Sequence, residues 1–126
     1  MLVIDAANVV GSRPTGWWRD RAGAARAFVE QVRAGVETGR LQPPIVVVLE
    51  GKARQGVASG LSGDVTVVHA AGSGDDALVD VVASARAADS EQAVTLVTAD
   101  RELQARAEAR GASIVRPGWL LERLEV

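Results

Sequence analysis

Acidic side chains follow four apolar, strand-like runs within the first hundred residues of this 126-residue chain: Asp5, Glu50, the pair Asp75-Asp76, and Asp100. Because the carboxyl ends of parallel strands share one edge of an open α/β sheet, we expect these carboxylates to meet in one cleft. Clustered carboxylates repel one another, and their pKa values rise unless a cation neutralises them. Oxygen ligands of this kind suit Mg²⁺ or Mn²⁺. The pattern therefore indicates metal-assisted phosphodiester chemistry.

The elements that must position these residues alternate along the chain. Hydrophobic runs predict strands at residues 2–5, 45–49, 65–69, 94–98 and 113–115. Helical spacing of apolar residues predicts helices at 18–38, 75–88 and 101–110, with a short amphipathic helix after Pro117. The glycine-containing segments 8–17 and 51–63 are expected to be loops, the second with at most one helical turn. This alternation predicts a three-layer α/β/α sandwich with a mainly parallel sheet.

The composition limits the chemistry further. A length of 126 residues predicts a single domain, residues 1–126. The chain has no cysteine and one histidine, which excludes disulfides, thiolate metal sites and poly-histidine zinc sites. Its net charge is −2, so it is not a basic nucleic-acid binder as a whole. No membrane-length apolar stretch or signal-type segment is present, so we expect a cytoplasmic protein. A homodimer is left open.

Asn8, Asp100 and the pair Asp75-Asp76 each have two interpretations. Asn8, three residues after Asp5, can hydrogen-bond a carboxylate or phosphate oxygen, or close the strand in a local turn. Asp100 can ligate a metal, with Thr98 adding its hydroxyl, or it can cap the following helix. Asp75 and Asp76 can stabilise the start of a helix through its dipole or serve as ligands, and the sequence does not decide between the two residues.

Basic and aromatic residues near these positions are candidates for RNA binding. Glu50 can join the acidic cluster or pair with Lys52 or Arg54. The tryptophan pair can stack on bases or anchor a loop. The predicted RNA-binding set is Arg13, Trp17, Trp18, Arg19, Lys52 and Arg54.

Three short motifs resemble the NYN domains, in particular the YacP-like group of the PIN-like nuclease superfamily. They are Asp5-Ala-Ala-Asn8-Val-Val-Gly, Gly72-Ser-Gly-Asp75-Asp76 and Val97-Thr98-Ala99-Asp100-Arg101, and together they span most of the chain. The resemblance implies a PIN-like fold, a divalent-metal site and ribonuclease activity. By matching position it implies site roles for Asp5, Asn8, Asp75, Asp76 and Asp100. Two departures are Ala6, in place of the usual glycine, and Glu50, where an aspartate is often found.

The sequence therefore predicts an endoribonuclease that depends on Mg²⁺ or Mn²⁺. Asp5, Asp100 and one or both of Asp75 and Asp76 would hold the metal, with Asn8, Thr98 and Glu50 in support. Two alternatives stay open at this point. One is a metal-dependent phosphohydrolase of small nucleotides, and the other is a catalytically degenerate domain that binds RNA or a protein.

Overall fold

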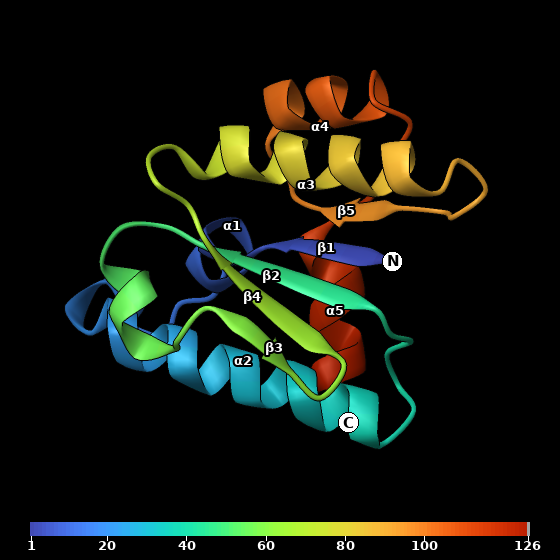
Figure 1. Cartoon of the computed structure of the whole chain (residues 1–126). Coiled ribbons are helices and arrows are strands. Elements are labelled where there is room, and N and C mark those ends of the chain that lie inside the picture. The colour runs from blue at the N-terminus through green and yellow to red at the C-terminus, as the bar shows by residue number, and fades with distance from the viewer. Residues whose placement is uncertain (126) are drawn as a thin grey trace.

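Five parallel strands and one antiparallel edge strand form the sheet of the protein, whose computed structural model describes residues 1–125 (Figure 1). The spatial order is β3-β4-β2-β1-β5-β6, and only β3 runs antiparallel, against β4. The strands are β1 (Leu2–Asp5), β2 (Ile45–Leu49), β3 (Gly60–Ser62), β4 (Val65–His69), β5 (Thr95–Val97) and β6 (Ser113–Val115).

The strand order reverses beside β1. From β1 the chain moves outward through β2 and β4, and it later returns to place β5 and β6 on the other side of β1. In open α/β sheets, ligands bind at such a reversal, beyond the carboxyl ends of the strands. Asp5 is the last residue of β1, and Thr98 directly follows β5. The topology thus brings these two residues, distant in sequence, to the same point of the sheet edge.

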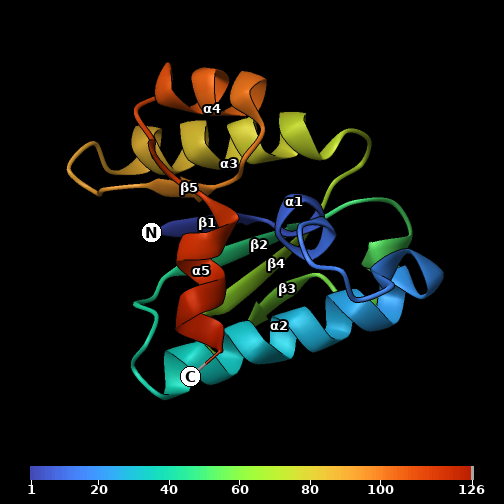
Figure 2. The same ribbon diagram turned by 180° about the vertical axis from the view of Figure 1, so that it is seen from behind.

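Helices cover both faces of the sheet, as Figures 1 and 2 show. Along β1, Ile4 packs with Phe28 on one face, and Val3 packs with Leu78 and Leu103 on the other, because successive side chains of a strand alternate. The first face carries α1 (Ala6–Gly11), α2 (Arg21–Glu37) and α5 (Pro117–Leu124). The second carries α3 (Gly74–Ala88) and α4 (Arg101–Glu108). The predicted three-layer α/β architecture is confirmed.

Local boundaries differ from the sequence prediction in three places. Residues 6–11 form α1 instead of a loop, since Ala6 and Val9 are buried against the core and the Asp5 carboxylate accepts a bond at the helix start. The long helix begins at Arg21 and not at residue 18, because Asp20 caps it, and residues Trp17–Arg19 form a separate 3₁₀ turn, η1. The segment 51–63 holds the 3₁₀ helix η2 (Gly51–Gly56) and strand β3.

The other predicted elements lie within one or two residues of their expected bounds, and α4 ends two residues before its expected end. Within the part of the chain that the structure describes, no helix has the length and apolarity required to cross a membrane.

Candidate active site

Asp5 occupies the centre of the sheet edge and is almost enclosed, with 8% of its surface exposed. One carboxylate oxygen accepts a hydrogen bond from the backbone N–H of Asn8 at 3.2 Å. The other accepts a bond from the hydroxyl of the fully buried Thr98 at 2.9 Å. Both oxygens are therefore held in fixed directions by two different segments of the chain. A buried carboxylate needs such partners, because an unpaired one is costly to desolvate.

One further bond ties α1 to the segment after β5, and another fixes Thr98 within that segment. The side-chain oxygen of Asn8 accepts a bond from the backbone N–H of Ala99 at 2.9 Å. The Thr98 oxygen accepts a bond from the backbone N–H of Asp100 at 3.2 Å while its hydroxyl proton points to Asp5. Asn8 thus ties helix α1 to the segment after β5, 91 residues later, and does not only close its own turn. The structure places the predicted supporting residues, Asn8 and Thr98, directly around Asp5.

The carboxylates at this edge influence one another electrostatically. Burial raises the pKa of Asp5 from 3.8 to about 6, the bonds from Thr98 and Asn8 oppose that rise, and the charges of Asp75 and Glu50 add to it. The pKa of Asp75 is also raised, first by burial and then by repulsion from Asp100 and Glu50. Asp75 and Glu50 are therefore near enough to influence Asp5, and Asp100 and Glu50 are near enough to influence Asp75.

The two adjacent aspartates of α3 face different surroundings. Asp75 is half-buried and is repelled by Asp100 and Glu50. Asp76 is 72% exposed and makes an ion pair with Arg106 of α4 at 2.8 Å. The orientation of the helix therefore turns Asp75 toward the other acids and Asp76 toward the neighbouring helix.

Glu50 and Asp100 are each fixed by a backbone N–H at the start of a helix. Glu50 accepts a bond from the N–H of Gly74 at 2.8 Å, and a Cβ at position 74 would collide with the Glu50 carboxylate. Asp100 caps α4 by accepting from the N–H of Leu103 at 3.1 Å. Neither Glu50 nor Asp100 makes an ion pair within residues 1–125. Glu50 therefore stands with the acidic residues and has no ion-pair bond to Lys52 or Arg54.

As the side chains stand, no three acidic or histidine groups among the described residues are close enough together to hold a metal ion. Mg²⁺ does not require such a cage, because it keeps several waters and binds through one or two carboxylates together with substrate phosphates. Asp5 and Asp75 are the two carboxylates at this edge whose pKa values are raised. Neither has an ion-pair partner within residues 1–125. Arg106 offsets part of the negative charge of Asp75, and the charge that remains on these hard oxygen atoms fits a divalent cation.

The predicted RNA-binding residues divide into engaged and free side chains. Arg54 donates to the carbonyls of Gly51 and Ala70, and its position stabilises η2. Arg13 contacts Gln31 at 3.3 Å and Glu125 at 3.4 Å.

Of the rest of that set, Trp17 is half-buried, and Trp18, Arg19 and Lys52 are exposed. Arg19 lies 5.7 Å from the centre of the Trp18 ring, and Trp18 is 54% exposed. Lys52 is exposed and makes no hydrogen bond or ion pair inside residues 1–125.

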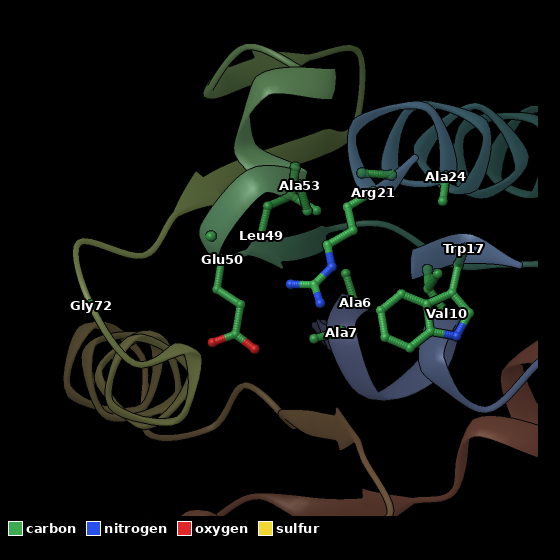
Figure 3. A pocket seen from close by; sticks show the side chains of 12 residues that line it. Ala6, Ala7, Val10, Trp17, Arg21, Ala24, Leu49, Glu50, Ala53 and Gly72 are labelled. Carbon is green, nitrogen blue, oxygen red and sulfur yellow. The ribbon is translucent and has the colours of Figure 1, made fainter. Parts of the chain in front are cut away.

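A cavity of about 380 Å³ opens beside Glu50, and sequence reasoning did not predict it (Figure 3). Trp17 and Arg21 form one side of it, and Glu50 points into the same space from the end of β2. Small side chains leave the volume open, namely Ala6, Ala7, Ala24, Ala25 and Ala53. The recurrence of alanine in α1 and at the start of α2 was the available sequence signal.

No protein-family model and no curated protein sequence matches the chain. Crystal structures of Rae1 (YacP) from Bacillus subtilis superpose on it closely. The W164L mutant gives a TM-score of 0.73 at 16% identity and covers 98% of this chain and 74% of that one. A second structure of that protein gives a TM-score of 0.73 at 15% identity and covers 99% of this chain and 73% of that one. The chain has the fold of the NYN-domain protein YacP. The resemblance seen in the three motifs is thereby confirmed for the fold.

Proposed function

We propose that the protein is an endoribonuclease that hydrolyses RNA phosphodiester bonds with the help of Mg²⁺ or Mn²⁺. The observation that carries this proposal is that the almost enclosed Asp5 lies at the point where the strand order reverses, is joined through Thr98 to the segment of Asp100, and has Asp75 and Glu50 near enough to raise its pKa. Neighbouring carboxylates destabilise a fold unless a cation or a proton neutralises them, and groups with perturbed pKa values concentrate at functional sites. The NYN-type nuclease fold supports the same assignment.

Asp5 and Asp75 would hold the ion, with Asp100 next to them. When bound, the ion supplies an activated water and a counter-charge for the phosphate. Thr98 and Asn8 keep the two oxygens of Asp5 in place, so that the carboxylate needs no rearrangement when the ion and substrate arrive. Glu50 holds the start of α3 through Gly74 and thereby sets the position of Asp75.

RNA is the proposed substrate because the surroundings of the acids offer cationic and aromatic side chains. Arg19 and Lys52 are exposed and suit backbone phosphates, while Trp18 offers an exposed ring. Arg13 and Arg54, which were predicted to bind phosphate, are held by contacts within the protein. We therefore assign them a smaller share of the binding.

The test is cleavage of an end-labelled single-stranded RNA in Mn²⁺ or Mg²⁺, with and without EDTA. We expect internal cuts that EDTA abolishes. Asp5→Asn and Asp75→Asn should each lower the rate of RNA cleavage by more than the roughly 10–100-fold that removal of a supporting group costs. Asp76→Asn should lose less than Asp75→Asn, because Asp76 faces Arg106. Asp80→Asn makes the same chemical change at an exposed site on α3 and should cleave like the wild type.

Two other outcomes decide against this function. Hydrolysis of free nucleotides without RNA cleavage would identify a small-nucleotide phosphohydrolase. RNA or protein binding that survives Asp5→Asn, with no cleavage by either protein, would identify a degenerate binding domain.

A further inference from the structure

The cavity beside Glu50 has the size and walls of a nucleobase site. Its volume of about 380 Å³ lies near the lower end of the roughly 300–1,000 Å³ typical of small-ligand pockets. One wall is the ring of Trp17, and the alanines that line the rest leave room for a flat group to lie against it. Aromatic rings bind unpaired bases by stacking, with little dependence on base identity. Stacking alone would therefore hold a base without selecting one.

Two side chains of opposite charge, Arg21 and Glu50, point into this cavity. The Arg21 guanidinium lies 5.5 Å from the centre of the Trp17 ring, near the outer limit of about 6 Å for a cation–π contact. Arg21 is exposed, and within residues 1–125 it makes no hydrogen bond or ion pair. Glu50 uses one oxygen to hold Gly74 and has its other oxygen free for a ligand. Both groups point into the cavity without forming an ion pair with each other (Figure 3).

The combination of a guanidinium and a carboxylate matches guanine better than any other base. Guanine presents two acceptors, O6 and N7, to which arginine donates in a bidentate pair. Its N1–H and N2–H₂ groups are donors, and a carboxylate is an acceptor only. We propose that this cavity holds one unpaired guanine of an RNA strand, stacked on Trp17, with Arg21 on its O6/N7 edge and Glu50 on its donor edge. The proposal rests on the proposed function only in taking RNA as the source of the base.

Neutral nucleosides test the cavity separately from the nuclease. Guanosine, 7-deazaguanosine and cytidine would each be titrated in EDTA, and the indole N–H signals followed by NMR, with Trp17 assigned by Trp17→Phe. We expect guanosine to shift the Trp17 signal. 7-Deazaguanosine, which lacks the N7 acceptor, should bind at least about five-fold more weakly, as should cytidine. This assay needs no metal, phosphate or cleavage.

Variants of Arg21 test whether its guanidinium recognises the O6/N7 edge of guanine. Arg21→Ala should weaken guanosine binding at least about five-fold and remove its advantage over 7-deazaguanosine. Arg21→Lys keeps the charge but loses the planar fork, so it too should lose this advantage. Arg40→Ala removes an exposed arginine from the turn beyond the far end of α2 and should bind guanosine like the wild type.

A uridine-rich RNA with a single guanine supplies the second measurement. Wild-type cuts should concentrate at one fixed distance from the guanine, and Arg21→Ala should spread them. Equal affinity for the three nucleosides, or no guanosine binding by a protein that cleaves RNA, overturns the guanine site. Guanosine binding with the expected Arg21 dependence, but without RNA cleavage, supports the site and overturns the nuclease function instead.

Discussion

Replacing Asp5 by asparagine should stabilise the ion-free protein at neutral pH. The pKa of Asp5 rises from 3.8 in the unfolded chain to about 6 in the fold. Between these pH values Asp5 keeps a proton in the folded protein that it has released in the unfolded chain. The contribution of Asp5 to the free energy of unfolding is therefore fully present below pH 3.8 and is lost as the pH rises through 6. An interval of about two pH units at about 1.4 kcal/mol per unit is a loss of about 3 kcal/mol. Asparagine does not titrate and avoids this loss.

The local hydrogen bonds reduce the expected gain. The side-chain oxygen of the new asparagine can still accept the bond from the Asn8 backbone N–H. Its NH₂ group then faces the Thr98 hydroxyl and cannot accept a hydrogen bond from it. An imperfect buried hydrogen bond costs about 1 kcal/mol. We therefore expect the free energy of unfolding of Asp5→Asn to exceed that of the wild type by about 2 kcal/mol at pH 7, and we expect this difference to disappear near pH 4.

Urea unfolding in EDTA, followed by tryptophan fluorescence from pH 4 to 7.5, measures this difference directly. The reference variant is Asp80→Asn, whose exposed side chain should change the free energy of unfolding by no more than about 0.5 kcal/mol at any pH. The reasoning is refuted if the difference between Asp5→Asn and the wild type stays constant across this range. A variant that is less stable than the wild type at pH 7 would refute it equally.

Three further results are expected. Mn²⁺ at about 100 times its dissociation constant should stabilise the wild type by about 2.7 kcal/mol, seen as a higher Tm than in EDTA, and Asp5→Asn should lose this response. Thr98→Val should lower the free energy of unfolding by about 1–3 kcal/mol and raise the pKa of Asp5 further, because the hydroxyl bond lowers that pKa. Thr98→Ser keeps the hydroxyl and should retain most of the free energy of unfolding in the same pH series. Gly56→Ala should destabilise by more than about 2 kcal/mol in urea unfolding, since the new Cβ would collide with the Ala22 carbonyl. Gly118→Ala, with nothing within 4 Å, should stay near wild type; equal effects of the two alanines would contradict the clash.

The sheet and the ends of its strands were predictable because burial on both faces leaves a direct mark in the sequence. The run Ile45–Leu49 is apolar at every position and is buried at every position. The placement of Asp5 and Asp100 at one edge follows from that pattern and from the parallel topology. These features depend on local composition and on a general rule of chain connection.

Other features depend on contacts between distant residues and left no local mark. Helix α1 is short and ends at Gly11, and its start is set by Asp5, whose carboxylate also belongs to the acidic cluster. Arg106, which lies 30 residues beyond Asp76, makes an ion pair with Asp76 and not with Asp75. Neither arrangement can be deduced from the spacing of residue types alone.

The bonds that join the segment after β1 to the segment after β5 also set the order in which the protein can mature during synthesis. Asp5 and Asn8 are made first, yet their partners Thr98 and Ala99 lie 93 and 91 residues later. Chains emerge from the N-terminus, at roughly 5–20 residues per second. A growing chain that already contains Asp5, Glu50 and Asp75 still lacks the strand that fixes Asp5. The bonds that hold Asp5 and tie down Asn8 therefore form only after residues 98 and 99 have left the ribosome, and no shorter intermediate of translation contains them.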